Sequence, residues 1–567
     1  MGFSFSPYKS CFKPTAKSKI PALTIYCPKI LFVNMKKYIY LLLFVSLFTF
    51  DISRCFSQTP TQEWVARYNS PHSENDRFEE IVLDKFGNAY LTGWNLDSIN
   101  GNDIITVKIN SSGQIVWSQV YNSGGPGSND IGKAITIDDS GNVYVTGYTG
   151  MNLGPYNIIT IKYDDLGIMK WFRIYTAETS EAFAIKTDMA GNIYVTGGTG
   201  RAITIKYNTN GDTLWIRKYF TGSFSVTTCL TIDRLGMIYT AGYVEISNHS
   251  NALIMKYDSS GNLLWGNYYD NGGFSQSVSI AVDSVGNGAI TGSFTPIPMG
   301  NSNYYTLRFT ATGNTIWQKY YNGGTFDDYA TSVAIDKIGN TYVTGSSWGS
   351  TIDYVTIKYN LLGDTIWTRR YNGPAGSYDQ AYSLCLDEKG NCYVTGASIG
   401  TGSGDDYATI KYDSTGFQKW VVRYNGPANG GDGAGSVILG NNNTIYVGGE
   451  SDGIGTGKDL AVIKYDQLIE ITKNTNNIPV YCRLFQNYPN PFNSSTVVSY
   501  ELPKRGNVNL SLFNSLGQLV KIIVKGNKDT GYYSIIINSD NLSSGIYFYK
   551  ITVDNKFIDT KKLVIIK

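Results

Sequence analysis

The alternation of hydrophobic and polar positions returns to one short pattern along most of the chain. GNVYVTG at 141–147 recurs as GNAYLTG, GNIYVTG, GMIYTAG, GNGAITG, GNTYVTG and GNCYVTG, which start at Gly87, Gly191, Gly236, Gly286, Gly339 and Gly390. A more divergent eighth copy, NTIYVGG, ends at Gly449. Each copy alternates apolar and polar residues after a turn, which is typical of a β-strand. The starts lie 45 to 54 residues apart, and this spacing predicts a solenoid or a propeller.

Four strand types recur in a fixed order, eight times each, between Glu63 and Asp466. The second type ends in a turn acid such as Asp138, which only the eighth copy lacks, and the third is the GNxYVTG strand. The first carries a tryptophan: Trp64, Trp117, Trp171, Trp215, Trp265, Trp317, Trp367 and Trp420. The fourth carries a basic residue: Lys108, Lys162, Lys206, Lys256, Arg308, Lys358, Lys411 and Lys464. The pattern predicts 32 short strands in eight groups of four.

Turn lengths indicate where each group begins. Asp-x-x-Gly-Asn joins the second and third strands in a tight hairpin, in which glycine takes the left-handed conformation and aspartate caps the turn. The fourth strand reaches the tryptophan strand through an equally short turn, whereas the other two connections are long. The tryptophan strand is then the outermost strand of each blade. Because the last group has no tryptophan strand, we expect the strand around Trp64 to complete it and close a ring.

The repeated motif D-x-A-x-x-I-x-[ILV]-D-x-x-G-N-x-Y-V-T-G resembles the bacterial β-propeller repeat family called SBBP, over roughly residues 62–466. The resemblance implies a propeller fold and says little about function, since one fold hosts many activities. With the strand phasing, it predicts that residues 58–466 form an all-β, eight-bladed propeller of four-stranded blades, closed by the N-terminal strand.

The N-terminal residues 1–57 have the pattern of a leader. Met35-Lys36-Lys37 precedes a 13-residue apolar run at 38–50, which predicts a signal peptide over about 35–57, cleaved near Ser57. The run is too short to span a bilayer comfortably. A lipoprotein anchor at Cys55 is the weaker alternative, because Arg54 lies where small residues are required. We expect Met35 rather than Met1 to be the true start.

The C-terminal part of the chain differs from the repeats. Residues 467–483 are predicted to be a linker, and residues 484–567 a second, smaller β domain. Its motif residues are Tyr488, Pro489, Asn490, Pro491, Phe492, Leu516, Gly517, Ser544, Gly545, Ile546, Tyr547, Lys561 and Lys562. These motifs closely resemble the C-terminal sorting domain of type IX secretion cargo, with one departure at Ser494, where proline is common.

That resemblance implies an immunoglobulin-like β-sandwich that the type IX export machinery recognises at the outer membrane. The protein is then expected to pass through the periplasm and to reach the outer cell surface or the medium. The family also implies removal of the domain on release, or attachment of the cargo to outer-membrane glycolipid.

Charge and residue types exclude several classes of function. Residues 58–466 carry 27 basic and 38 acidic residues, a net charge of −11, so nucleic acid is not an expected partner. Neither histidine, His72 or His249, holds a repeated position, which disfavours a histidine triad or metal site. No phosphate-binding or EF-hand loop is present, and we expect no metal and no cofactor. For Cys385 and Cys392, on neighbouring strands, buried thiols are favoured over a disulfide.

One constellation of side chains is a candidate ligand site. Eight residues before each turn-acid position, where the innermost strand begins, stand Asp76, Asp130, Ser180, Ser225, Ser275, Asp328, Asp379 and Asp432. The favoured interpretation is that each residue caps its own loop. The alternative is that the five aspartates, on contiguous blades 6, 7, 8, 1 and 2, form an acidic channel mouth that binds a cation or a hydroxyl-rich ligand.

Three further rows are interpreted as structural. The tryptophans are expected to pack between blades, and the basic residues to pack their stems on aromatic rings. A second acidic row, Asp103, Asp353, Asp406 and Asp459, opens the fourth strands and is expected to cap them.

The expected function is binding or adhesion by a secreted or surface-attached protein, with a glycan or a protein as ligand and no enzymatic activity. One alternative is a propeller hydrolase or lyase that acts on extracellular polysaccharide through carboxylates at the mouth. Another is a structural component of the cell surface. An enzyme should break the repeat with unique polar residues, and the most divergent repeats, 3 and 5, gain no recognisable catalytic pair.

Overall fold

The structure is a computed structural model of the whole chain. It describes residues 59–567 apart from 72–74, 98–100, 125–126, 152–153, 299, 325, 442–443, 468–481, 488, 540–541 and 567. The predicted leader, with its signal peptide, Cys55 and both start sites, lies outside the described residues, as do His72, Tyr488 and most of the predicted linker. The described part of the chain is β throughout and contains no α-helix, so none of its segments is a helix that could cross a membrane.

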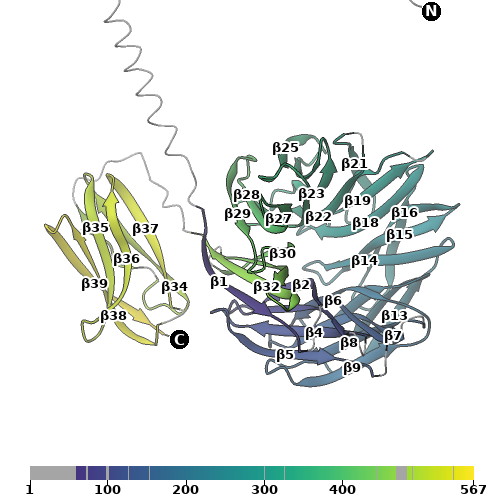
Figure 1. Cartoon of the computed structure of the whole chain (residues 1–567), viewed down its shortest axis with the longest axis horizontal. Coiled ribbons are helices and arrows are strands. Elements are labelled where there is room, and N and C mark those ends of the chain that lie inside the picture. The colour runs from purple at the N-terminus through teal and green to yellow at the C-terminus, as the bar shows by residue number, and fades with distance from the viewer. Residues whose placement is uncertain are drawn as a thin grey trace, which may run out of the picture. The chain divides into compact units, whose positions relative to one another are not determined.

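The described residues between Thr61 and Asp466 form 32 strands, the number that the repeat pattern predicts (Figure 1). The first sixteen are β1 (Thr61–Tyr68), β2 (Asn75–Leu83), β3 (Ala89–Asp97), β4 (Gly101–Ile109), β5 (Ile115–Tyr121), β6 (Ser128–Ile137), β7 (Val143–Met151), β8 (Asn157–Tyr163), β9 (Met169–Tyr175), β10 (Ala182–Thr187), β11 (Ile193–Gly197), β12 (Ala202–Tyr207), β13 (Thr213–Tyr219), β14 (Phe224–Ile232), β15 (Ile238–Ile246) and β16 (His249–Tyr257). The next sixteen are β17 (Leu263–Tyr269), β18 (Gly273–Val282), β19 (Gly288–Pro296), β20 (Asn303–Phe309), β21 (Thr315–Tyr321), β22 (Asp328–Ile335), β23 (Thr341–Trp348), β24 (Ile352–Tyr359), β25 (Thr365–Tyr371), β26 (Asp379–Leu386), β27 (Cys392–Ile399), β28 (Asp405–Tyr412), β29 (Gln418–Tyr424), β30 (Asp432–Leu439), β31 (Ile445–Gly453) and β32 (Gly457–Asp466).

Successive strands pair as antiparallel neighbours in sets of four, which we call repeats and number as the predicted blades. Repeat 1 is β2–β5, and the numbering continues in steps of four strands to repeat 7, β26–β29. Repeat 8 consists of β30–β32 and β1. Short parallel pairings, Asn75 with Lys458 and Gly101 with Ser128, join repeats 8, 1 and 2 into one twelve-stranded sheet. The other repeats are separate four-stranded sheets.

The first strand of each repeat contacts the first strand of the next. These contacts run in order through β2, β6, β10, β14, β18, β22, β26 and β30, and β30 in turn contacts β2. Figure 1 shows β30 and β32 beside β2. Packing of small sheets around a common centre through their first strands is the arrangement of a β-propeller.

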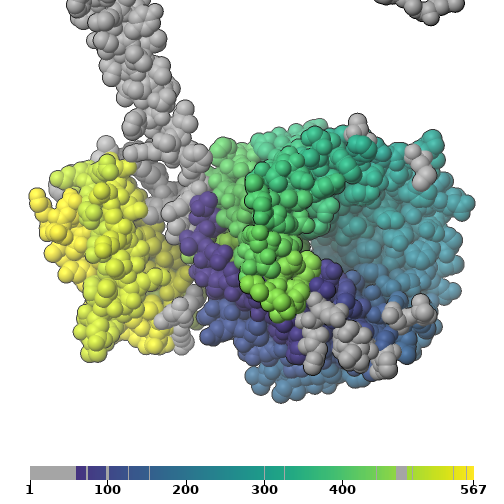
Figure 2. Space-filling view, viewed as in Figure 1, coloured from purple at the N-terminus to yellow at the C-terminus, as the bar shows by residue number. Residues whose placement is uncertain are grey.

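Strand β1 lies antiparallel to β32, as the strand phasing predicts. Trp64 is opposite Lys464, and Tyr68 is opposite Leu460. In Figures 1 and 2 the purple N-terminal strand accordingly lies against the green residues of the last repeat.

An ion pair repeated in three repeats gives independent support for the place of β1. Arg370 of repeat 6 lies 2.7 Å from Asp353, and Arg423 of repeat 7 lies 2.8 Å from Asp406. Each arginine follows its row tryptophan by three residues. In repeat 8 the matching arginine is Arg67 of β1, which lies 2.7 Å from Asp459. The N-terminal strand therefore supplies the same contact that the tryptophan strands supply elsewhere.

The tight hairpins have the predicted geometry. At Asp138 the backbone N–H donates to the Asn142 carbonyl at 3.0 Å, and Gly141 has a φ of +84°. The Asp138 carboxylate accepts the N–H groups of Ser140 and Asn142, both at 2.9 Å. A side chain with a Cβ would be strained at this φ, which explains the glycine at this position in repeats 1 to 7.

The tryptophan and basic rows form the contacts between neighbouring repeats. In repeat 1, Trp117 Nε1 and Lys108 Nζ both donate to the Asp165 carbonyl of repeat 2, each at 3.0 Å. Lys108 Nζ also lies 5.2 Å from the centre of the Tyr90 ring. From repeat 8, Trp64 and Lys464 donate in the same way to Ser111 of repeat 1, at 3.0 and 3.2 Å. The structure thus gives both rows a packing role.

The end of the repeat region requires a substitute for one of these contacts. In repeat 8 the outer strand β1 precedes β32 in the chain, so no short turn leads from β32 into it as one does in the other repeats. Lys411 of repeat 7 donates instead to the side-chain oxygen of Gln467, at 2.6 Å.

The divergence of the eighth copy has a packing reason. Phe78 of repeat 1 is the one large side chain at its position, where the other repeats have Gly, Ala, Ser or Thr. A Cβ at Gly448 would lie 2.8 Å from the Phe78 ring, and a Cβ at Gly435 would lie 2.6 Å from it. Six repeats have threonine, and repeat 4 has Ala241, where repeat 8 has Gly448. The two glycines therefore make room for Phe78 where repeats 8 and 1 meet.

The C-terminal residues form a separate pair of sheets. Their strands are β33 (Arg483–Leu484), β34 (Ser495–Leu502), β35 (Gly506–Asn514), β36 (Leu519–Lys528), β37 (Gly531–Asn538), β38 (Gly545–Val553) and β39 (Phe557–Ile565). One sheet has the order β33-β34-β37 and the other β36-β35-β38-β39. Val498 and Tyr500 of the first share a buried core with Leu510 and Tyr549 of the second, as expected for a β-sandwich.

Candidate functional site

The predicted acidic row is buried. All eight residues at the starts of the innermost strands expose 1% or less of their surface: Asp76, Asp130, Ser180, Ser225, Ser275, Asp328, Asp379 and Asp432. A carboxylate buried to this degree requires hydrogen-bond donors, because desolvation disfavours its charged form.

The donors come from the loop that precedes each strand. Asp76 accepts the Ser70 N–H at 2.8 Å, and Asp130 accepts the Ser123 N–H at 2.8 Å. Asp328, Asp379 and Asp432 accept N–H groups of glycines at positions 323, 373 and 426, at 2.7, 2.6 and 2.6 Å. These contacts are those of the capping interpretation.

The alternative, a cation site at the mouth, stays a prediction. Among the residues that the structure describes, no group of three or more His, Cys, Asp and Glu side chains is arranged to hold a metal ion. The second acidic row is also largely committed, since Asp353, Asp406 and Asp459 form the ion pairs with arginine described above.

The buried caps should make stability depend on pH. Burial raises the pKa of Asp76 to about 6, although the Ser70 hydroxyl and N–H oppose the shift. The unfolded pKa is close to 4, so the folded chain binds the proton more tightly between about pH 4 and 6. Stability should therefore fall as pH rises through that window, by roughly 3 kcal/mol for this group.

Thermal melts of the mature chain and of an Asp76→Asn variant across this pH range test the expectation. The variant cannot titrate at residue 76, so its melting temperature should fall less with rising pH. Some dependence should remain, because burial also raises the pKa of Asp379 and Asp432. Identical pH profiles for the two proteins would contradict a buried, titrating Asp76.

A hollow of about 410 Å³ lies where repeats 7, 8 and 1 meet. We call it the repeat-8 hollow. It is lined by Phe78, Tyr382, Ala397, Asp405, Gly431, Asp432, Gly433, Ala434, Gly435, Glu450 and Lys458. These residues come from the first halves of β2, β26, β28 and β30, from the end of β27, and from β31 and β32 near their connecting loop. The hollow therefore lies on the face that carries the long loops.

The hollow exists because repeat 8 departs from the repeat at several positions. Gly433 stands where repeats 5 and 7 have glutamine, and a Cβ there would find no atom closer than 3.9 Å. The space beside Gly435, in contrast, is occupied by the Phe78 ring. Glu450 is the only acid among the eight residues at its position, and Lys458 stands where repeat 7 has Asp405. A comparison of the eight repeats, position by position, could have found these departures. Repeats 3 and 5 were singled out as the most divergent, so the departures of repeat 8 were missed.

Charged groups of both signs surround the hollow. Glu450 lies 2.9 Å from Arg77 and 3.6 Å from Lys458. Lys458 also donates to the Gly431 carbonyl at 3.3 Å. Partial burial raises the pKa of Asp405, while the cation of Lys458 opposes the shift. The hollow thus offers both hydrogen-bond donors and acceptors.

An aromatic ring forms one wall. The Tyr382 side chain is 40% exposed, and its hydroxyl donates to Gln380 Oε1 at 2.6 Å, which fixes the ring. Burial raises the pKa of Tyr382, and the charges of Asp405 and Glu450 raise it further. The ring and the two carboxylates line the same hollow. An open ring beside fixed polar groups is a typical composition for a ligand site.

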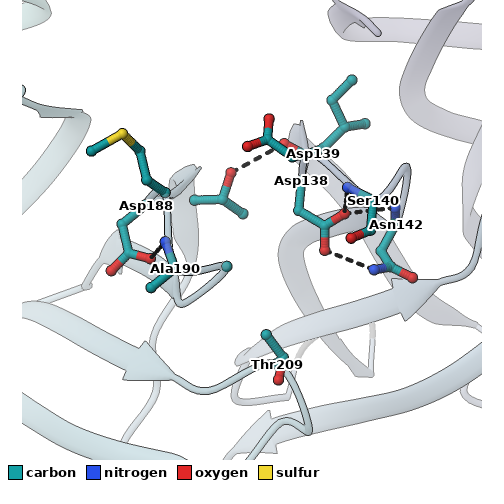
Figure 3. Close-up of a pocket in the computed structure, with 11 residues that line it drawn as sticks. Asp138, Asp139, Ser140, Asn142, Asp188, Ala190 and Thr209 are labelled. Carbon is teal, nitrogen blue, oxygen red and sulfur yellow. Dashed lines mark hydrogen bonds between the residues drawn. The ribbon is translucent and has the colours of Figure 1, made fainter. Parts of the chain in front are cut away.

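A second hollow, of about 460 Å³, lies between the tight turns of repeats 2 and 3 (Figure 3). Two of its three carboxylates are already used, because Asp138 caps its own turn and Asp188 accepts the Ala190 N–H at 3.0 Å. Figure 3 shows both groups bent back onto their turns. Since the same turn recurs in the other repeats, this hollow is a space between turns and not a departure from the repeat.

The four described cysteines carry no disulfide. Cys229, Cys385, Cys392 and Cys482 are free thiols, and burial raises the pKa of Cys385 and Cys392. Cys385 and Cys392 are thus free thiols as expected, with Cys392 buried and Cys385 half-buried.

Two family models match parts of the chain. Residues 486–567 match the secretion system C-terminal sorting domain, and residues 117–154 match the β-propeller repeat family SBBP. The chain carries SBBP propeller repeats and a type IX sorting domain. It is therefore exported by type IX secretion to the cell surface or the extracellular space, and its sorting domain is recognised by that machinery.

Comparison with curated proteins finds no match. Among solved structures, Sqt1 from Chaetomium thermophilum is 10% identical with a TM-score of 0.46, and the match covers 72% of this chain and 100% of that one. A fungal alcohol oxidase in complex with copper is 11% identical at 0.39, covering 90% and 100%. A protein of unknown function from Bacteroides caccae is 12% identical at 0.30, covering 59% and 93%.

The sorting-domain motifs tie its first residues to its last strand. Asn490 Oδ1 accepts the Val564 N–H at 2.8 Å, and Phe492, 4% exposed, joins the core. The Asn490 side-chain amide donates to the Lys562 carbonyl at 3.1 Å. The Lys561 ammonium lies 3.5 Å from the Asp559 carboxylate.

Other motif residues lie at a turn and at the start of a strand. Gly517 has a φ of +76°, Gly545 begins β38, and the Tyr547 hydroxyl donates to the Ser543 carbonyl. Pro489 directly precedes Asn490 and Pro491, and its carbonyl accepts the Thr496 hydroxyl at 2.6 Å.

Proposed function

We propose that this protein is a surface-delivered binding protein and not an enzyme. In this proposal its eight repeats form a closed eight-bladed propeller, with β1 completing the last blade. The sorting domain delivers the propeller to the outside of the cell, where it is released or attached to outer-membrane glycolipid. The propeller then binds a neutral glycan in the repeat-8 hollow.

The observation that carries the proposal is the break in the repeat around the hollow. The other seven repeats all have a side chain at the position of Gly433. Only repeat 8 has an acid at the position of Glu450 and a lysine at the position of Lys458. Packing against Phe78 explains Gly435 and Gly448. It does not explain Gly433, whose Cβ position is open. A ligand that occupies the hollow accounts for the remaining departures.

The lining favours a neutral, hydroxyl-rich ligand. Asp405 and Glu450 can accept hydroxyl protons, Lys458 can donate, and the Tyr382 ring can pack against the apolar face of a sugar. The net charge of −11 over residues 58–466 disfavours anionic polymers. A neutral glycan matches these features better than a sulfated or phosphorylated one.

A neutral-glycan array probed with the mature chain tests the proposal. We expect binding that a Gly433→Gln variant weakens at least about ten-fold, because the restored side chain occupies the hollow. Gln276→Ala, at the matching exposed position of repeat 5, is the control and should bind like the mature chain. Absence of binding to every neutral glycan, or equal binding by the Gly433→Gln variant, would overturn the proposal.

A hydrolase is the second candidate, since two carboxylates in one hollow have different environments. Asp405 has a raised pKa, whereas Glu450 is paired with Arg77. That pairing leaves Glu450 poorly placed to act as a nucleophile or base, so we favour binding. Incubation with polysaccharides that bind should therefore release no reducing ends. Release that an Asp405→Asn variant abolishes would establish the hydrolase instead.

A further inference from the structure

Three aromatic rings form an exposed cluster on the loop face of repeats 6 and 7, which we call the aromatic shelf. Phe326 lies just before β22, Trp348 ends β23, and Tyr378 lies just before β26. The centres of the Phe326 and Trp348 rings are 4.7 Å apart, and those of Trp348 and Tyr378 are 6.5 Å apart. Phe326 and Tyr378 are 50% and 53% exposed. Trp348 is also one of only two tryptophans outside the repeated row.

Side chains of repeat 6 hold the backbone at Trp348 and at the residue before it. The buried carboxylate of Asp328 accepts the Trp348 N–H at 3.1 Å. Arg370 donates to the Ser347 hydroxyl at 2.8 Å and to the Ser347 carbonyl at 3.1 Å. Asp328 is thus a positioning residue for the shelf. A ring held in place before binding loses little conformational freedom when a ligand packs on it.

The surroundings of the shelf favour an uncharged ligand. The guanidinium of Arg370 is paired with Asp353 at 2.7 Å and is committed to the repeat. The rings offer flat apolar faces, and exposed aromatic clusters of this kind mark interaction sites. The apolar faces of sugar rings fit such surfaces, while their hydroxyl groups remain in water.

The start of β26 in repeat 7 joins the shelf to the repeat-8 hollow. Tyr378 lies four residues before Tyr382, the ring that lines the hollow. Four residues of extended strand cover about 13 Å, a distance that a short oligosaccharide can span. One extended ligand can therefore contact both places.

We propose that the aromatic shelf is a second carbohydrate subsite, which binds the outer sugars of the same neutral polysaccharide chain that enters the hollow. This inference rests on the proposed function and adds that the protein recognises a chain and not a single terminal sugar. Trp348 contributes most, because it lies between the other two rings.

Calorimetric titration of the mature chain with neutral oligosaccharides, from disaccharide to hexasaccharide, tests the subsite. The probes are β-linked glucose, mannose and xylose series. For a series that binds, the hexasaccharide should bind roughly ten-fold more tightly than the disaccharide. Trp348→Ala should remove that gain and leave disaccharide binding unchanged, while Trp348→Phe should keep most of it. Tyr378→Ala provides a second variant if Trp348→Ala does not fold.

The control is Phe224→Ala, which removes one ring of a stacked pair with Tyr243 in repeat 4 and should preserve the gain. If disaccharides bind but affinity does not rise with length, or if both shelf variants keep the gain, the subsite is wrong and the hollow stands. If no series binds at any length, the neutral-glycan function fails and the subsite fails with it.

Discussion

A mature chain that lacks residues 59–68 should lose much of the stability of its last repeat. The deletion removes β1, and with it the antiparallel pairing from Thr61 to Tyr68 against β32. It also leaves Asp459 buried without Arg67, and the Ser111 carbonyl without Trp64. Loss of one partner of a buried ion pair and of a strand ladder should together cost on the order of 5 kcal/mol or more.

Hydrogen exchange followed by mass spectrometry measures this effect where it arises. Peptides from β30 to β32 should exchange much faster in the deletion variant, because β32 becomes an open edge. Peptides from repeats 4 and 5, which lie far from β1 along the chain, serve as the internal control. Unchanged protection of residues 460–465 would show that β1 does not stabilise repeat 8.

Removal of the sorting domain should abolish surface delivery. A chain that ends at Gln467 keeps all of β1 to β32 and should fold, since the described core of the sorting domain is built from its own strands. In a bacterium with type IX secretion, this chain should accumulate in the periplasm. Immunodetection on intact cells, compared with fractionated periplasm, measures the distribution.

The matched control carries the missing part alone. Residues 468–567, fused behind a signal peptide and a fluorescent protein, should reach the cell surface. Normal surface delivery of the truncated chain would contradict export through the sorting domain.

Much of the fold could be predicted because the main structural contacts recur from repeat to repeat and therefore show as repeated residues in the sequence. A conserved-length hairpin with Asp138 and Gly141 fixes one edge of each repeat, and the short turn before each tryptophan fixes the other. Because no tryptophan strand follows Lys464, the strand around Trp64 was predicted to complete the last repeat. The rows of lysine and tryptophan were also interpretable, because side chains that recur in every repeat meet the same neighbour each time.

The candidate site could not be predicted in the same way, because it depends on which departures are filled. Gly433, Gly435 and Gly448 are equivalent as departures in the sequence. Only the three-dimensional arrangement shows that Phe78, from the other end of the repeat region, fills the space beside two of them and leaves the third open. The acidic row posed the reverse problem, since Asp76 and its counterparts resemble an open mouth until their loop donors are known.

The most direct test of the account is a crystal structure of the mature protein with an oligosaccharide that binds on the array. The account predicts a sugar ring against Tyr382, within hydrogen-bond distance of Asp405 or Lys458, and further sugars over Trp348. Sugar density at the turns around Asp138 and Asp188, or on the outer tryptophan strands, with the repeat-8 hollow empty, would contradict it.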